Sequence, residues 1–148
     1  ERPDVRFMLA GDGPLREAIQ QRIADAGLTQ AVDFVGHVTQ PQLAGLMQQS
    51  SVLCLPSVSE GWPNVIVEAL ACGCPIVAGN VGGIPEIINN DAYGYLCDPH
   101  DENNIARKLT MALERDWDRQ GLAARGSTWL RDDMMHSVTD VYDQVLGH

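Results

Sequence analysis

The sequence predicts an α/β fold in which a doubly wound, Rossmann-like parallel sheet has helices on both faces. Short apolar runs alternate along the chain with segments whose apolar residues recur at three-to-four spacing, as in amphipathic helices. The apolar runs are unbroken, which is typical of parallel strands buried on both faces. With 148 residues, 45% of them apolar, the chain is long enough for one domain with a hydrophobic core.

The first third of the chain predicts two strand–helix pairs. The first strand is Val5–Ala10, and the helix that follows has Pro14 in its first turn and ends before Gly27. The apolar stripe of this helix consists of Leu15, Ala18, Ile19, Ile23 and Ala26. The second strand is Val32–Val35, and Thr39 is predicted to cap the next helix. The stripe of that helix consists of Leu43, Leu46 and Met47.

The rest of the chain predicts three more strands, two short helices and a helical C-terminus. In order, these are a strand at Val52–Leu55, a helix from about Pro63 to Cys72, a strand at Pro75–Ala78, a short helix at Pro85–Asn89 and an edge strand at Tyr95–Cys97. From Asp101 onward the pattern is helical. Its two apolar stripes consist of Ile105, Leu109, Ala112 and Leu113, and of Val138, Val141, Tyr142, Val145 and Leu146. Gly126 and Ser127 are predicted to separate two of these helices.

The charge of the chain argues against polyanionic partners. Asp and Glu number 20 against 10 Lys and Arg, so the formal net charge is −10, and Lys108 is the only lysine. Without a basic run, the chain is a poor candidate for binding nucleic acid or an anionic lipid surface. Aromatic residues make up only 5% of the chain, which also argues against a base-stacking platform.

The four cysteines predict buried thiols rather than a metal site or disulfides. Cys72 and Cys74 are separated by one residue, which is shorter than the spacing of common zinc sites. Like Cys54 and Cys97, they stand beside apolar residues. Reduced thiols favour a reducing compartment, so we expect a cytoplasmic protein with no bound metal. The sequence has no uninterrupted run of about 18 apolar residues, so no transmembrane helix is predicted.

Three loops after predicted strands are candidate ligand sites, because ligands bind at the carboxyl ends of the strands in doubly wound sheets; the third of them is Gly82-Gly83. Gly11-Asp12-Gly13 follows the first strand, and its glycines let a backbone approach a ligand closely. Arg16 stands where a dinucleotide-binding loop has its third glycine. The two glycines alone are equally compatible with an ordinary turn.

The second loop leads into a helix that contains an unexpected charge. The helix from Pro63 to Cys72 is apolar nearly all round, so it is predicted to be buried, yet it contains Glu68. A buried carboxylate is strongly unfavourable unless it has partners. One interpretation is that Glu68 pairs with a distant arginine or faces a gap in the packing. The other is that it accepts hydrogen bonds from two neighbouring hydroxyls of a ligand.

The loop before this helix extends the candidate site. It contains Glu60, and Gly61 leaves the N–H groups of Trp62, Asn64 and Val65 exposed at the positive end of the helix dipole. The segment therefore presents a carboxylate, an anion site and a second carboxylate. A nucleotide sugar has the matching order of sugar hydroxyls, diphosphate and ribose hydroxyls.

The segment Ser57–Gly73 resembles the signature of retaining glycosyltransferases of the GT-B fold, family 4 (group 1) type, with its two glutamates separated by seven residues. Further motifs fall in the family's order: Gly11-Asp12-Gly13-Pro14-Leu15, Val35-Gly36-His37-Val38, Gly73-Cys74-Pro75-Ile76-Val77-Ala78, Gly82-Gly83-Ile84-Pro85-Glu86 and Gly94-Tyr95-Leu96 with Pro99. Each motif alone is weak, but the ordered set covers the whole chain. The resemblance implies that residues 1–148 are the C-terminal, donor-binding domain of a sugar transferase that uses a UDP or GDP sugar and no further cofactor.

The resemblance also implies a role for each candidate residue. Glu60 corresponds to the glutamate near the donor sugar and its anomeric carbon, and Glu68 to the one that holds the ribose hydroxyls. The diphosphate cradle corresponds to the backbone of Gly61, Trp62, Asn64 and Val65, with Gly11 and Gly13 facing it, and the base-contacting turn to the backbone of His37 and Val38. Simpler interpretations are packing for the Trp62 side chain, a surface position for His37 and an ordinary turn for Gly82-Gly83.

Parts of the family pattern are not found in this chain. In the family, an arginine and a lysine come before the position of Glu1, and neither Arg16 nor Lys108 matches them. If Val5–Ala10 is the family's second strand, the first, central strand of the order 3-2-1-4-5-6 is also missing, as is the N-terminal acceptor-binding domain. We therefore expect the isolated chain to be inactive. In the complete enzyme, catalysis is expected to be metal-independent and to depend on preorganised hydrogen-bond donors to the diphosphate. A peripheral attachment of the enzyme to the inner membrane, through the missing half, is compatible with this expectation.

Three other functions stay open. A non-catalytic nucleotide-sugar-binding module, a degenerate transferase half, would have the same fold and no turnover. A nucleotide-sugar epimerase is the nearest enzymatic alternative. A nicotinamide-dependent oxidoreductase would need an acidic residue at the end of its second strand, whereas Asp33 lies inside the strand and the third glycine is absent.

Overall fold

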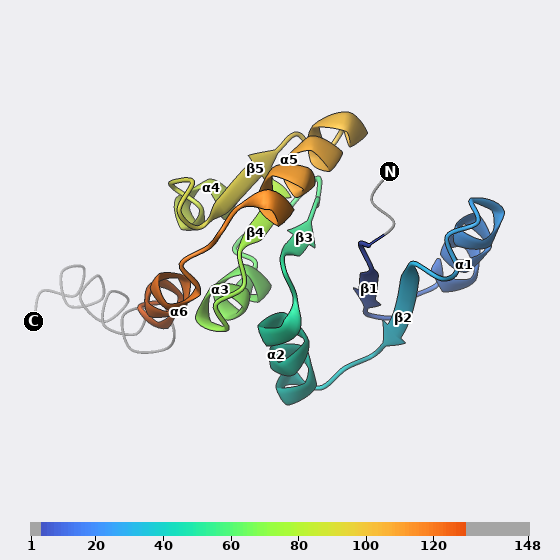
Figure 1. Cartoon of the computed structure of the whole chain (residues 1–148), viewed down its shortest axis with the longest axis horizontal. Helices are drawn as coiled ribbons and strands as arrows, with labels where there is room; N and C mark the ends of the chain where they lie inside the picture. The colour runs from blue at the N-terminus through green and yellow to red at the C-terminus, as the bar shows by residue number, and fades with distance from the viewer. Residues whose placement is uncertain (1–3, 130–148) are drawn as a thin grey trace, which may run out of the picture. The chain divides into compact units, whose positions relative to one another are not determined.

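Strands and helices alternate along the computed structural model, which describes residues 4–129 (Figure 1). In chain order the elements are β1 (Phe7–Ala10), α1 (Arg16–Asp25), β2 (Val32–Gly36), α2 (Gln40–Gln49), β3 (Leu53–Leu55), α3 (Asn64–Ala71), β4 (Ile76–Gly79), α4 (Ile84–Ile87), β5 (Gly94–Cys97), α5 (Glu102–Glu114) and α6 (Arg119–Ser127). The chain divides into two compact units, Glu1–Leu43 and Ala44–His148, and each is described by itself.

The first unit contains a two-stranded parallel sheet. Phe7 lies opposite Val32, and the pairing of β1 with β2 continues to Ala10 opposite Gly36. This unit is more exposed than its apolar pattern predicts, because α1 buries none of its side chains and Phe7 is 42% exposed. Within the described part of the chain, β2 is the only strand that pairs with β1, so the other edge of β1 carries no strand there.

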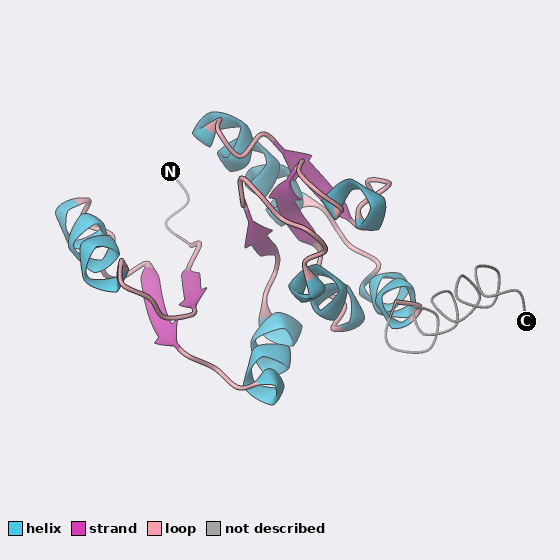
Figure 2. Cartoon of the chain, turned by 180° about the vertical axis from the view of Figure 1, so that it is seen from behind, coloured by secondary structure: helices cyan, strands magenta, loops and turns pink. Residues whose placement is uncertain are grey.

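The second unit contains a three-stranded parallel sheet in the order β3-β4-β5, with helices packed on it (Figure 2). Every residue of β4 is buried. Val77 of β4 belongs to a core cluster with Ala112 of α5. Because side chains alternate along a strand, Ile76 and Ala78 point to the opposite face, and α3 also contacts β4. The predicted parallel α/β fold is therefore confirmed, with β5 as the edge strand.

The bounds of the predicted elements agree with the described ones to within about two residues, except near Gly126. The predicted place of Pro14 is wrong, because α1 begins at Arg16 with Leu15 as its N-cap, so Pro14 precedes the helix. The sequence predicts a break between helices at Gly126 and Ser127, but both residues lie in the last turn of α6. The break before α6 instead spans residues 115–118, where the Asp118 side chain accepts a hydrogen bond from the N–H of Gly121 at 2.9 Å and caps the helix. Gly126 is needed for packing, since a Cβ there would overlap the Ala71 backbone of α3. The second predicted C-terminal stripe, from Val138 to Leu146, lies outside the described residues.

All four cysteines are free thiols, but the prediction that all of them are buried is confirmed for only two. Cys74 and Cys97 are buried, whereas Cys54 and Cys72 are half-buried. Burial raises the pKa of the Cys74 thiol from its ordinary value of 9.0 to about 11, and has the same effect on the pKa of Cys54. No helix in residues 4–129 is long and apolar enough to cross a bilayer.

The raised pKa of Cys74 predicts a loss of stability at alkaline pH. The unfolded thiol ionises near pH 9.0 but the folded one only near pH 11, so the folded state holds the extra proton between these values. Its contribution is complete below pH 9 and is lost as the pH rises to 11, at about 1.4 kcal/mol per pH unit. Urea unfolding at pH 8, 9 and 10 should show a weaker decline in Cys74→Ala than in the wild type. Equal declines would contradict the pKa assignment.

Candidate functional site

Glu68 lies in the middle of α3 and has no partner within the described protein. Its side chain is half-buried, and the flanking Val67 and Ala69 are buried. Within residues 4–129, no cation lies within ion-pair distance of Glu68 and no protein donor reaches its carboxylate. The predicted pairing with a distant arginine is therefore not found there, and both carboxylate oxygens are available to accept hydrogen bonds from a ligand.

The N-terminus of α3 has unused backbone donors. The helix begins at Asn64, after an extended Pro63, and no side chain caps it. In the part of the chain that the structure describes, the N–H groups of Gly61, Trp62, Asn64 and Val65 donate to no acceptor. These are the four residues that the sequence assigns to an anion cradle. Because they lie at the positive end of the helix dipole, they can bind a phosphate group.

Glu60 precedes this helix in a loop whose backbone lies against the turn after β4. The Glu60 side chain is half-buried. The N–H of Gly83 donates to the carbonyl oxygen of Gly61 at 2.8 Å. The indole of Trp62 packs against that of Trp129, with ring centroids 5.3 Å apart. The simpler interpretation of the Trp62 side chain, ordinary packing, is therefore confirmed, while its backbone N–H stays free.

The four candidate residues in the first unit lie at the carboxyl ends of β1 and β2. The N–H of Gly11 donates to the carbonyl oxygen of Gly36 at 2.7 Å, which brings the glycine loop beside the turn that contains His37 and Val38. Gly11 has a φ of +129°, and a Cβ at Gly11 or Gly13 would meet no atom within 4 Å. The glycine loop is therefore open, whereas His37 is exposed, as the simpler interpretation predicts.

Arg16 does not replace the cations that the sequence lacks. Its guanidinium donates to the Asp12 carboxylate at 3.2 Å and lies 5.7 Å from the centre of the Phe34 ring. Both contacts hold the side chain within the first unit. Across residues 4–129, no group of three or more His, Cys, Asp or Glu residues is arranged to hold a metal ion.

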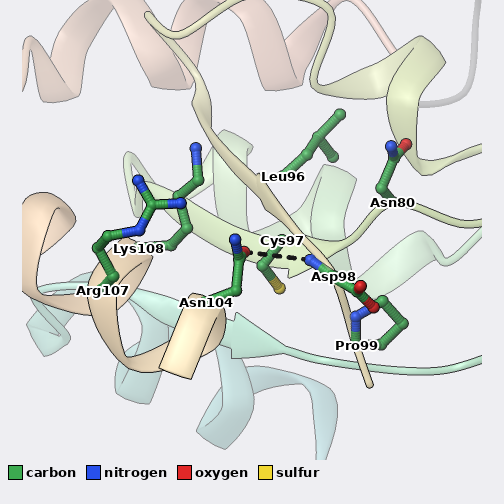
Figure 3. Close-up of a pocket in the computed structure, with 8 residues that line it drawn as sticks. All are labelled: Asn80, Leu96, Cys97, Asp98, Pro99, Asn104, Arg107 and Lys108. Carbon is green, nitrogen blue, oxygen red and sulfur yellow. Dashed lines mark hydrogen bonds between the residues drawn. The ribbon is translucent and has the colours of Figure 1, made fainter. Parts of the chain in front are cut away.

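The sequence analysis missed a cavity of about 430 Å³ in the second unit (Figure 3). It is lined by Asn80, Leu96, Cys97, Asp98, Pro99, Asn104, Arg107 and Lys108. Asn104, Arg107 and Lys108 stand at i, i+3 and i+4 on α5, so they share one face of the helix. The side-chain amide oxygen (Oδ1) of Asn104 accepts from the backbone N–H of Asp98 at 3.2 Å. In the sequence these residues form only a polar face of a helix, which does not distinguish a cavity from an ordinary solvent-exposed face.

Comparisons with known proteins identify the family to which the chain is similar. The family model described as "Glycosyl transferases group 1" matches residues 1–129. The 2-deoxystreptamine glucosyltransferase of Streptomyces kanamyceticus is 30% identical over 149 residues, covering 97% of this chain and 38% of the relative. The N-acetyl-alpha-D-glucosaminyl L-malate synthase of Bacillus anthracis is 35% identical over 75% of this chain and 29% of its own length.

Solved structures show the same fold with nucleotide ligands. Anabaena HepE in complex with UDP has a TM-score of 0.80 and 25% identity, covering 99% of this chain and 42% of HepE. Its complex with UDP-glucose has a TM-score of 0.70 and 30% identity over 84% of this chain and 35% of HepE. The chain therefore spans well under half the length of the relatives described above.

Proposed function

Because the chain belongs to the group 1 glycosyl transferases, we propose that it is the donor-binding part of an enzyme that transfers a sugar from a nucleotide-diphosphate sugar to an acceptor. Among residues 4–129, the N–H groups of Gly61, Trp62, Asn64 and Val65 donate to no acceptor and the glutamates on either side of them have no ion pair or hydrogen bond. This arrangement supports the proposed function most directly. It matches a ligand that is anionic in its middle and hydroxylated at both ends.

The order of hydroxyls, diphosphate and hydroxyls in the ligand gives each candidate residue of the second unit a role. The diphosphate binds at the N-terminus of α3, where the free N–H groups and the helix dipole both favour negative charge. Glu68 accepts hydrogen bonds from the ribose hydroxyls, and Glu60 acts at the donor sugar. In the first unit, the backbone of Gly11 and Gly13 contributes to phosphate binding and that of His37 and Val38 contacts the base.

The chemistry we propose is transfer with retention of the anomeric configuration, as in family 4. The bond between the anomeric carbon and the diphosphate oxygen breaks, and the diphosphate leaves with the electron pair. The hydroxyl oxygen of the acceptor attacks the anomeric carbon on the same face, and its proton passes to the departing diphosphate oxygen. Preorganised N–H donors stabilise the charge that develops on the leaving group. We propose that this step uses no metal ion and that the remaining cations, a central strand and the acceptor-binding domain come from outside this chain.

Nucleotide-sugar binding tests the function. UDP-glucose is the first probe, because the HepE complexes contain UDP and UDP-glucose, with a GDP sugar beside it. In titration calorimetry of the full-length protein, Glu68→Gln is expected to weaken binding about 10-fold or more, since a charged acceptor contributes about 1.5–3 kcal/mol. Glu102→Gln, an exposed glutamate in the first turn of α5, is the control and should bind like the wild type.

Two outcomes would contradict this proposal. If the full-length protein binds neither UDP nor GDP sugars, the nucleotide-sugar function is wrong. If Glu68→Gln binds as tightly as the wild type, the site lies elsewhere. Release of UDP or GDP by the wild type distinguishes an enzyme from a binding module, and turnover by residues 1–148 alone would show that the chain needs no further domain.

A further inference from the structure

The turn after β4 is built from glycines that lie directly against the loop containing Glu60. The N–H of Gly83 donates to the carbonyl oxygen of Gly61 at 2.8 Å, which joins the two segments. Gly82 has a φ of +54°, in the left-handed region that favours glycine. The two segments are therefore joined directly through their main chains.

Three glycines at this turn occupy places where a side chain would collide with the loop. A Cβ at Gly79 would overlap the carbonyl oxygen of Ser57, and a Cβ at Gly82 would overlap that of Glu60. A Cβ at Gly83 would lie 2.9 Å from the carbonyl oxygen of Gly61 and 2.8 Å from the Trp62 ring. Three of the four colliding groups, the carbonyl oxygens of Ser57, Glu60 and Gly61, are main chain, which cannot move aside as a flexible side chain can.

The loop that contains Glu60 is also held in place by the packing of the Trp62 side chain. The Trp62 indole contacts Trp129, and the guanidinium of Arg125 stacks 4.9 Å from the centre of the Trp129 ring. Arg125 comes from α6, which packs closely on α3. Trp62 is therefore held between the glycine turn and Trp129, which follows α6, so the loop cannot relax away from an added side chain without disturbing this packing.

We propose that Gly82 and Gly83 are positioning residues for sugar transfer, which set the place of the Glu60 carboxylate through the backbone of its loop. The proposal rests on the proposed function, because that function gives Glu60 its task at the donor sugar. A displacement of about 1 Å at a reacting group can lower a rate about 10²-fold. Gly82 lies directly against the Glu60 carbonyl group, whereas Glu68 lies on α3, beyond the Glu60 loop. A change at Gly82 is therefore expected to affect Glu60 more than Glu68.

The test compares Gly82→Ala with Gly27→Ala in the full-length protein. Gly27 has a similar φ of +68°, but a Cβ there would meet nothing within 4 Å. Both variants carry the strain of the left-handed backbone, and only Gly82→Ala collides with the loop. We expect Gly82→Ala to lower kcat for UDP release from UDP-glucose about 10²-fold, with UDP affinity within about threefold of the wild type. Gly27→Ala should keep the wild-type kcat.

Hydrogen exchange supplies a readout that does not depend on turnover. Gly82→Ala should speed exchange in residues 57–63, and Gly27→Ala should not. If Gly82→Ala does not fold, Gly83→Ala replaces it in the test. Gly83 has an ordinary φ, and a Cβ there would collide with the Trp62 ring as well as with the main chain. Unchanged kcat and exchange in both Gly82→Ala and Gly83→Ala would overturn the proposal. A joint fall of kcat, UDP affinity and melting temperature would also overturn the proposal, because it indicates a general structural role for the turn. A wild type without any turnover contradicts the proposed function instead, and the exchange data still decide whether the turn holds the loop.

Discussion

Replacing Glu60 by glutamine in the full-length protein is expected to lower kcat for sugar transfer by about 10²–10³-fold, the loss typical of removing one preorganised electrostatic contact. Glutamine has nearly the same shape but no charge, so it cannot stabilise the positive charge that develops at the anomeric carbon. Protein stability should not change, because the described chain offers the Glu60 carboxylate no ion pair or hydrogen bond to lose. Transfer to water, measured as UDP release from UDP-glucose, needs no known acceptor.

Glu68→Gln and Glu102→Gln show whether a lower rate comes from weaker donor binding or from a slower chemical step. Glu68→Gln should mainly weaken donor binding, with a smaller change in kcat at saturating donor, because the ribose lies away from the reacting atoms. Glu102→Gln should resemble the wild type in both quantities. A Glu60→Gln enzyme that retains kcat within twofold would show that Glu60 is not catalytic. A wild type that binds UDP-glucose without releasing UDP would favour the non-catalytic module.

The sequence predicts the elements of the second unit well because its local signals agree. The strand at 75–78 is an unbroken apolar run, and β4 is buried at every residue. Gly73, with a φ of +71°, ends the preceding helix where the sequence places the stop. When propensity, hydrophobic pattern and turn residues all indicate the same structure, a single sequence is enough.

Contacts between distant segments are what a single sequence cannot predict. Gly126 looks like a helix break, and only the packing of α6 on α3 explains why a glycine stands inside a helix. Gly82 and Gly83 look like an ordinary turn, and their approach to the Glu60 loop depends on the tertiary fold. That Glu68 pairs with no arginine among residues 4–129 likewise needed the structure, since the sequence alone left a distant arginine possible.

The exposure of the first unit has a different physical cause. Phe7 and Met8 are apolar strand residues, yet they are 42% and 43% exposed. A strand is buried on both faces only when neighbouring strands and helices cover it, and β1 pairs with β2 alone among the described strands. The prediction that a further strand pairs with β1 would account for this apolar surface, and it stays a prediction.

Replacing Gly126 by alanine is expected to lower the free energy of unfolding by about 3 kcal/mol, at the upper end of the range for overpacking. A Cβ at Gly126 would overlap the Ala71 backbone nitrogen and would lie 2.5 Å from the carbonyl carbon of Leu70. Because the colliding atoms are the main chain of α3, the two helices would have to separate. The N–H groups at the start of α3 and Glu68 would shift with the helix, so UDP affinity should fall as well.

Gly45→Ala is the matched control for this substitution. Gly45 also lies inside a helix, α2, but a Cβ there would meet nothing within 4 Å. Alanine should therefore raise stability by about 0.5–1 kcal/mol, because it loses less backbone entropy in a helix than glycine. The same Gly→Ala change is thus expected to alter the free energy of unfolding in opposite directions at two helical positions. The comparison therefore excludes a general effect of an added methyl group. Urea unfolding of the full-length protein, with hydrogen exchange of residues 64–71 as a local measure, checks both signs. A Gly126→Ala protein as stable as Gly45→Ala would mean that α6 does not lie against α3.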